Sequence, residues 1–201
     1  MRAIHQFVAG FSRGDAISNE ALALQRVFRA WGFDSDIFCE ARRILPELRR
    51  EAREIGESRT ACQPDDVVLL HLSVGSVVND LFRELPCHKA LLYHNISPPD
   101  YFRFIQPATA MLLEQGRKQV RALAGAATVN LADSRFNAAE LEQSGYPKVE
   151  VFPLFMEFDK LERKPDRGVL ARARDGLVNV LFVGRCAPNK KIEDVLMAFA
   201  V

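Results

Sequence analysis

The sequence predicts an α/β protein in which a parallel β-sheet carries helices on both faces. Short apolar runs alternate with amphipathic segments along almost the whole 201-residue chain. The runs are continuously apolar, without alternation of apolar and polar residues, and this is typical of strands that are buried on both sides. Hydrophobic residues make up 48% of the chain, enough for a sizeable core.

The first strand is predicted over residues 3–9, and the turn GFSRGD follows it. Asp15 is a good N-cap for the next helix, which Gly32 ends. Residues 34–39 give a second short strand, and the charged segment 42–57 is predicted to be a solvated helix. The alternative for this segment is a helix whose arginines form a face that binds the surface of a membrane. The apolar residues of the first helix recur at helical spacing: Ile17, Ala21, Leu24, Phe28 and Trp31.

The remaining part of the chain repeats this alternation. Gly145 follows the last helix of the series, and the Pro-rich loop 95–100 follows one of the buried strands. Pro107 suits the first position of a long helix. Strands are predicted at residues 66–72, 90–94, 128–132 and 149–152, and helices at residues 75–85, 107–124 and 135–144.

Polar residues gather where four of the predicted strands end. In a parallel sheet, ligands collect at the carboxyl ends of the strands, so these residues are candidates for a binding site. Each also has a purely structural explanation: a turn glycine with an N-cap, a hydrogen-bonded buried histidine, or a helix cap. The four clusters are Gly14–Asp15, His71–Ser73, His94–Asn95 and Asp133–Ser134.

Composition narrows the class of protein. Basic and acidic residues number 27 and 26, so nothing in the charge balance favours binding to nucleic acid. The four cysteines have no CxxC spacing, and no apolar run approaches the roughly 20 residues of a membrane span. We expect a cytoplasmic protein with free thiols. The alternative is a protein that binds peripherally to the inner face of the membrane.

Two kinds of cofactor site are disfavoured. The segment SRGDAIS lacks the GxGxxG spacing of dinucleotide-binding proteins. The four histidines show no spacing that would place a metal site on one element, so no metal is expected.

The last stretch, residues 178–201, opens a new unit. An apolar run at 178–183 predicts a strand, Gly184 ends it, and Asn189 is a good N-cap for the helix that follows. Arg185 and Lys190 lie in the loop between them. Free backbone N–H groups, a helix dipole and two cations suit a diphosphate.

This stretch resembles glycosyltransferase family 4, a group of retaining enzymes with the GT-B fold. The family pattern is approximately VGR-x-x-P-x-KG-x-x-x-L-x-A-F, and the chain has VGRCAPNKKIEDVLMAF, with Lys191 in place of the usual glycine. Upstream, GDAISNEALALQRVFRAWGFDSDIF, LLYHNISPPDYF and LADSRFNAAELEQSGYPKVEVFP resemble further family segments. The resemblance covers essentially the whole chain.

The resemblance implies two Rossmann-like domains that face each other across a cleft, and transfer of a sugar from a nucleotide-sugar to a glycan or lipid-linked acceptor. It implies that Arg185 and Lys190 hold the donor diphosphate. Gly14, with Asp15, would form the first-domain loop that closes over the donor phosphates or the acceptor. These roles are expectations carried over position by position.

The resemblance also implies the remaining site residues. His94 would be the catalytic residue near the donor sugar, Asn95 would support it, and Ser134 would lie on the sugar or acceptor side of the cleft. Because cations and helix dipoles handle the charge of the leaving group in this family, neither a metal nor a cofactor is expected beyond the nucleotide-sugar substrate.

The domain organisation follows from the same comparison. We expect an N-terminal acceptor-side domain over residues 1–158, a connection over 159–177, and the first strand and helix of a truncated donor-binding domain over 178–201. Roughly 150 residues of a typical second domain would then be absent, with the family's paired glutamates, so we expect this chain to be inactive alone. The alternatives are a non-catalytic Rossmann-like binding module and a GT-B epimerase or phosphorylase.

Overall fold

The computed structural model describes residues 2–156, 158, 162 and 164–200. The chain divides into two compact units, Met1–Phe155 and Met156–Val201. Among the described residues, no helix combines the length and the apolar character needed to cross a membrane.

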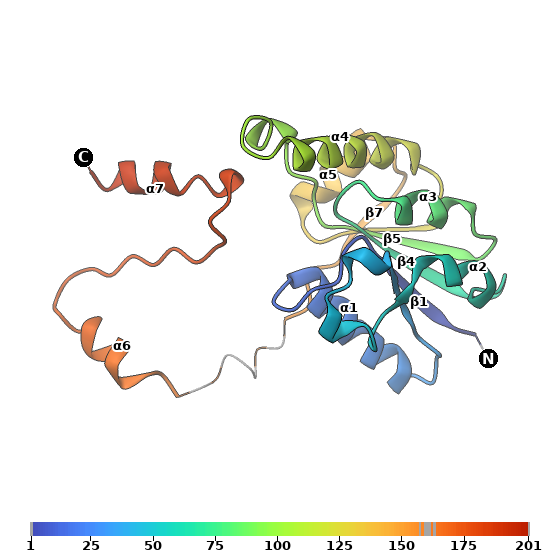
Figure 1. Ribbon diagram of the computed structural model, residues 1–201, viewed down its shortest axis with the longest axis horizontal. Helices are drawn as coiled ribbons and strands as arrows, with labels where there is room; N and C mark the ends of the chain where they lie inside the picture. Colours follow the sequence, from blue (N-terminus) through green and yellow to red (C-terminus); the bar gives the residue numbers. More distant parts are fainter. Residues whose placement is uncertain (1, 157, 159–161, 163, 201) are drawn as a thin grey trace. The chain divides into compact units, whose positions relative to one another are not determined.

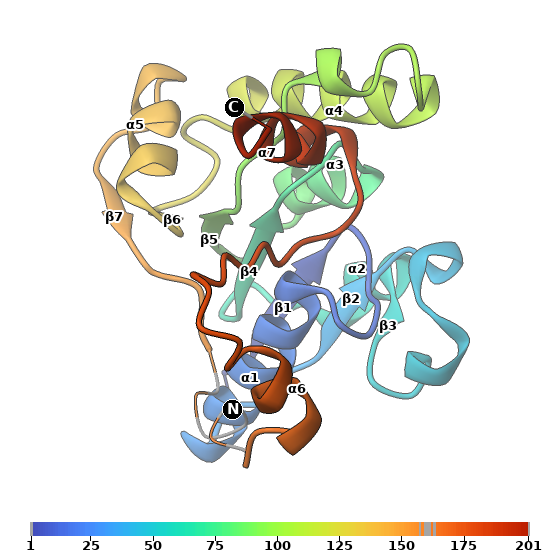
Figure 2. The same ribbon diagram turned by 90° about the vertical axis from the view of Figure 1, so that its left-hand side faces the viewer.

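A seven-stranded sheet forms the centre of the first unit, with the order β3-β2-β1-β4-β5-β6-β7 (Figure 2). Every neighbouring pair is parallel, as the continuously apolar runs predict. The central strands β1 and β4 are buried from their second residue onward, and β5 is buried over its last three residues, because both faces of the sheet are covered. The strands are β1 (Ile4–Val8), β2 (Ile37–Cys39), β3 (Arg53–Glu54), β4 (Val67–Leu72), β5 (His88–Tyr93), β6 (Val129–Ala132) and β7 (Val149–Val151).

Helices cover the two faces unequally (Figure 1). On one face, α1 (Ala16–Ala30) packs Leu24 against Leu69 of β4 and Leu92 of β5. On the other face lie α3 (Val77–Glu84), α4 (Pro107–Ala122) and α5 (Arg135–Gln143), whose apolar sides share one large core with β1, β4 and β5. A short helix, α2 (Ser58–Ala61), precedes β4. The predicted α/β class is therefore confirmed.

Two local predictions in this unit are wrong. The segment 42–57 is no helix: it consists of 3-10 turns at Ala41–Arg43, Pro46–Leu48 and Ile55–Glu57, with the edge strand β3 between them. Pro46 lacks the N–H group that a continuous helix would need. Trp31 was expected on the buried face of the first helix, but it lies just beyond the end of α1 and is 68% exposed.

The described part of the second unit contains two short α-helices, α6 (Arg167–Arg172) and α7 (Ile192–Ala198). The predicted strand at 178–183 does not form, because within the described part of this unit no neighbouring strand pairs with these residues. The apolar side chains of the run, such as Val178 and Leu181, are 93% and 84% exposed. Asn189 was expected as the N-cap of the last helix; it lies instead in a 3-10 turn, and Lys191 precedes α7.

Candidate functional site

A hollow of about 240 Å³ lies where the carboxyl ends of β1 and β4 meet. The chain runs from β1 to β2 on one side and reaches β4 on the other, so this is the point at which the strand order reverses. Crevices at such switch points are the usual ligand sites of open parallel sheets. The hollow is lined by Ala9, Gly10, Phe11, Ser12, Asp15, Ile17, Arg43, Leu45, Ser73 and Val74.

The loop between β1 and α1 forms one wall of this hollow and is held by its own hydrogen bonds. Gly14 has a φ of +72°, a conformation that side-chain-bearing residues adopt at a cost. The Asp15 carboxylate caps α1, where one oxygen accepts from both the backbone N–H and the hydroxyl of Ser18, each at 2.9 Å. The Ser18 hydroxyl oxygen in turn accepts from the N–H of Ser12 at 3.1 Å. The capping explanation for Asp15 is thus satisfied within the loop.

Beneath this edge, two histidines from neighbouring strands meet. The Nδ1 atom of His71, on β4, lies 3.0 Å from the Nε2 atom of His94, which follows β5. The Nε2 atom of His71 lies 3.0 Å from the side-chain oxygen of Gln6 on β1. Both histidine side chains are buried, at 0% and 2% exposure.

This arrangement fixes the tautomers of the neutral rings. The amide of Gln6 donates to the carbonyl of Ala21, so its oxygen faces His71 and can only accept. His71 therefore carries its proton on Nε2, and its Nδ1 accepts from the Nε2–H of His94. The Nδ1 atom of a neutral His94 is then left without a proton, and within the described chain it has no hydrogen-bond partner. Burial, and then the neighbouring His94, lower the pKa of His71 well below its ordinary value.

A buried carboxylate faces the histidine pair. Glu20, on α1, has a fully buried side chain whose Oε2 atom lies 3.5 Å from His94 Nε2 and 3.8 Å from His71 Nδ1. Its other oxygen accepts from the N–H of Phe155 at 3.0 Å. Burial raises the pKa of Glu20, although the Phe155 N–H and His94 oppose the shift.

The other ring nitrogen of His94 points toward the end of β6. Asp133 Oδ2 lies 3.7 Å from His94 Nδ1, too far for a hydrogen bond. Burial alone would raise the pKa of Asp133, but His94 and the donors from Asn137 and Ser134 lower it overall. Asn137 donates to Asp133 and accepts from the amide of Asn95 at 2.9 Å.

The predicted residues Asn95 and Ser134 both have structural tasks in this network. Asn95 has a φ of +70°, a left-handed conformation that asparagine tolerates better than most residues. Ser134 caps α5 by accepting from the N–H of Asn137 at 3.2 Å. The structure thus brings His94, Asn95 and Ser134 together at the ends of β5 and β6. Asp15 lines the neighbouring hollow instead, and Gly14 precedes it in the same loop.

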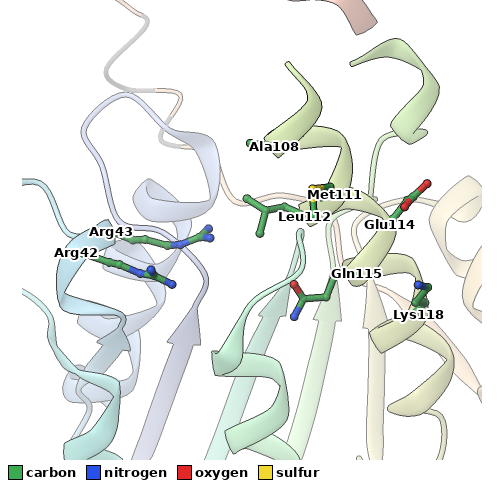
Figure 3. A pocket seen from close by; sticks show the side chains of 8 residues that line it. All are labelled: Arg42, Arg43, Ala108, Met111, Leu112, Glu114, Gln115 and Lys118. Atoms are coloured by element: carbon green, nitrogen blue, oxygen red, sulfur yellow. The ribbon is translucent and has the colours of Figure 1, made fainter. Parts of the chain in front are cut away.

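A wider groove of about 760 Å³ lies beyond this hollow, between the turn after β2 and α4 (Figure 3). The Arg42 and Arg43 side chains extend into it from one side, and Met111 and Leu112 line the other. Arg42 pairs with the buried Glu40 at 2.7 Å, and Glu40 also accepts from the Ser76 hydroxyl. A hollow of about 1060 Å³ lies at the opposite, amino-terminal edge of the sheet, where ligands of this fold class are not usually bound.

Arg185 and Lys190 belong to the second unit, where both are exposed. The left-handed φ of +50° at Lys191 is the conformation that the glycine of the family pattern would adopt without strain. That these two cations face the site residues of the first unit stays a prediction.

The sequence interpretation missed Glu20, Gln6 and the pairing of His71 with His94. A signal was present for the first two. Glu20 lies four residues before Leu24, on the apolar stripe of its helix, and Gln6 interrupts an apolar strand. The histidine pairing carried no local signal, because it depends on the register of β4 and β5.

Comparisons with known proteins concern the fold. No family model matches the sequence, and no curated protein does. Among solved structures, an alpha-glucosyltransferase in complex with UDP is similar, with a TM-score of 0.52 and 14% identity over 80% of this chain and 46% of that one. A second structure is an alpha-glucosyltransferase in complex with UDP and a 13-mer DNA containing a HMU base. It gives a TM-score of 0.49 at 14% identity, covering 79% of this chain and 44% of that one.

A structure described as "Trehalose-6-phosphate from E. coli bound with UDP-2-fluoro glucose" gives a TM-score of 0.43 at 11% identity, over 85% of this chain and 53% of that one. The chain thus spans about half the length of these proteins. At such identities the likeness concerns the fold alone, and the Rossmann-like parallel sheet with helices on both faces is the fold shared with the alpha-glucosyltransferase.

Proposed function

We propose that this chain is part of a retaining glycosyltransferase of the family 4 type, which moves a sugar from a nucleotide-sugar to a glycan or lipid-linked acceptor. The observation that carries the proposal is the hollow at the switch point of the sheet, in a fold shared with an alpha-glucosyltransferase that was solved with UDP. At about 240 Å³ the hollow suits one sugar ring or phosphate group, which leaves most of a nucleotide to be bound elsewhere.

Under this proposal the donor diphosphate is held by Arg185 and Lys190. Cleavage of the bond between sugar and phosphate builds negative charge on the departing diphosphate, and preorganised cations and N–H groups stabilise that charge. Neither cation forms an ion pair in the described part of the second unit, so both have charge to offer. Gly14, with its left-handed backbone, would let the β1–α1 loop approach the phosphates.

His94 would face the donor sugar through its Nδ1 edge. In the neutral network this nitrogen is a bare acceptor, and the Asp133 carboxylate 3.7 Å away is a second one. A sugar hydroxyl beside the two atoms, within hydrogen-bond distance of both, would supply the missing donor. Asn95 and Ser134 would hold this edge in place through Asn137, and no metal or cofactor is needed for the transfer itself.

The acceptor would occupy the groove between the turn after β2 and α4. Three basic residues line this groove, Arg42, Arg43 and Lys118, against one acidic residue, Glu114, and the exposed Met111 adds an apolar surface. The combination suits an anionic acceptor with an apolar part, such as a lipid-linked glycan. A peripheral contact with a membrane at the cytoplasmic side belongs to the same proposal.

Titration calorimetry with UDP and UDP-glucose, and with their guanosine and adenosine counterparts, tests the donor half of the proposal. We expect one nucleoside diphosphate to bind, and Arg185→Gln or Lys190→Gln to weaken it roughly tenfold or more. The matched control is Arg174→Gln, another exposed arginine of the second unit, which should leave the affinity within about twofold. Equal affinities in all three variants, or no binding, would contradict the assignment.

A further inference from the structure

A chain of three hydrogen bonds runs through the interior of the first unit, from His94 to helix α1. His94 Nε2 lies 3.0 Å from His71 Nδ1, and His71 Nε2 lies 3.0 Å from the side-chain oxygen of Gln6. The amide nitrogen of Gln6 donates to the carbonyl of Ala21 at 2.9 Å. These residues are buried, with Gln6, Ala21 and His71 at 0% exposure. Their polar groups must therefore satisfy one another inside the protein.

The end of this chain at α1 decides its direction. The carbonyl of Ala21 can only accept, so Gln6 turns its amide nitrogen to Ala21 and its oxygen to His71. With the amide turned over, two carbonyl oxygens would oppose each other at Ala21. All three hydrogen bonds therefore donate in one direction, away from His94. Hydrogen bonds aligned in this way polarise and strengthen one another.

The rings of the two histidines meet edge to edge. Their planes differ by 4°, and their centroids are 5.2 Å apart, about one ring's width more than the distance between the two nitrogens. The N–H of His94 therefore points along the shared plane at the lone pair of His71 Nδ1, which is favourable hydrogen-bond geometry. The Glu20 carboxylate, whose Oε2 atom lies 3.5 Å from His94 Nε2, favours a proton on the same nitrogen.

The other tautomer of His94 is the competing state. A proton on its Nδ1 would face the Asp133 carboxylate, 3.7 Å away. The bare Nε2 would then oppose the bare Nδ1 of His71 at 3.0 Å, with Glu20 Oε2 as a third acceptor beside them. Buried acceptors that face one another without a proton are costly. The hydrogen bonds behind His94 thus keep its Nδ1 free of a proton.

We propose that Gln6 and His71 are positioning residues, which hold His94 in the tautomer whose Nδ1 accepts a hydrogen bond at the end of β5. Gln6 and His71 are fully buried and act on a ligand only through His94. The inference rests on the proposed function in that the donor sugar supplies the hydroxyl for this Nδ1. Such an edge selects a ligand with an O–H or N–H group at this position, because a ligand without one leaves a buried acceptor unpaired.

Long-range ¹H–¹⁵N NMR tests the tautomers without any ligand. The spectrum of the ¹⁵N-labelled chain at neutral pH shows which ring nitrogen of each histidine carries the proton. Variants His5→Gln and His88→Gln identify the signals of those two residues, so that the remaining signals belong to His71 and His94. We expect both of these rings to be protonated on Nε2 alone. A proton on Nδ1 of either ring in the wild type would overturn the proposal.

A variant of Gln6 tests its influence on His94. Gln6→Met keeps a side chain of similar length and removes the acceptor for His71. We expect both rings to shift toward the Nδ1–H tautomer, so that His71 donates to His94 and His94 donates toward Asp133. The matched control is Gln25→Met, which removes another buried amide bond, from Gln25 to the carbonyl of Ser35 at 2.9 Å. Unchanged tautomers in folded Gln6→Met, or the same shift in Gln25→Met, would overturn the proposal.

Calorimetry connects the tautomer to the donor sugar. UDP-glucose, with its guanosine and adenosine counterparts, is compared with the nucleoside diphosphates that lack the sugar. We expect Gln6→Met to weaken the nucleotide-sugar roughly tenfold, the usual cost of one lost hydrogen bond, and to leave the diphosphate within about twofold. Shifted tautomers with an unchanged nucleotide-sugar affinity would overturn the role of His94 at the sugar. If the wild type binds none of these ligands, the proposed function fails, whereas the NMR result still decides the tautomers.

Discussion

Burial separates the four cysteines into two groups. Cys39, Cys62 and Cys87 are buried free thiols, and Cys186 is exposed. Burial raises the pKa of both Cys39 and Cys62 to about 12, and it also raises the pKa of Cys87. Since the thiolate is the reactive form, these three should be inert in the folded protein.

A thiol titration checks this difference. With Ellman's reagent at pH 8, we expect one rapidly reacting thiol per native chain and four after denaturation in guanidinium. A Cys186→Ser variant should show none of the rapid reaction. Rapid modification of two or more thiols in the native wild type would mean that the interior opens readily.

His5 gives the stability of the protein a dependence on pH. Its ring is buried, and its Nδ1 accepts from the N–H of Asp36 at 3.2 Å. Burial lowers the pKa of His5 below 6.5, although Asp36 and Asp66 oppose the shift. Below pH 6.5 the unfolded state therefore binds a proton more readily than the folded state, so the unfolding free energy falls as the pH falls.

Urea unfolding between pH 7.5 and 5.5 measures the effect. Below pH 6.5, His5 contributes at most about 1.4 kcal/mol per pH unit to the slope of the unfolding free energy against pH. His5→Gln keeps an acceptor for Asp36 and removes the titration, so its unfolding free energy should decline less than that of the wild type. Parallel pH profiles for the two proteins would show that His5 does not contribute.

At the scale of elements, α4 is held against the loop that follows β4 by two glycines. The N–H of Gly75 donates to the carbonyl of Leu112 at 3.0 Å. A Cβ atom on Gly116 would lie 2.7 Å from the nitrogen of Gly75 and 2.9 Å from Ile96 Cδ1. These distances are too short for non-bonded atoms, so the contact requires glycine.

Gly116→Ala should therefore destabilise the protein, by about 1–3 kcal/mol, as overpacked core substitutions do. Helix propensity alone would predict the opposite sign, because alanine is favoured over glycine by roughly 1 kcal/mol in a helix interior. The control is Gly10→Ala, where a Cβ would meet nothing within 4 Å. A higher urea midpoint in Gly116→Ala than in the wild type would contradict the close packing.

At the scale of the whole molecule, the two units differ in how much they bury. The large core belongs to the first unit, and no described residue of the second unit is buried. Val183 is 83% exposed, and Leu196 and Phe199 of the last segment are 68% and 64% exposed. Amide protection should follow this difference, since exposed backbone groups exchange at low free-energy cost.

Hydrogen exchange followed by mass spectrometry compares the units within one sample. We expect the amides of β1, β4 and β5 to be protected for hours and those of residues 178–183 to exchange within seconds. Protection of residues 178–183 comparable to that of β4 would show that this run is covered in solution, for example by association of two chains.

The sequence by itself determined the class of the fold and the edge at which to look for a site. Periodicity and continuous apolar runs locate most strands and helices, and strand ends locate His94, Asn95 and Ser134, because these signals are local. Local signals failed at 42–57, where Pro46 and burial of single residues such as Leu48 replace a helix with turns, and at 178–183, where a strand needs a partner.

Only the tertiary structure decided what the site residues contact. Glu20, His71 and His94 are far apart in the chain, and they meet because α1 packs on β4 and β5 in one particular register. No residue pattern encodes a distance of 3.0 Å between two rings on different strands. The physical reason is that hydrogen bonding depends on the positions of atoms, and these positions are set by the packing of the whole sheet.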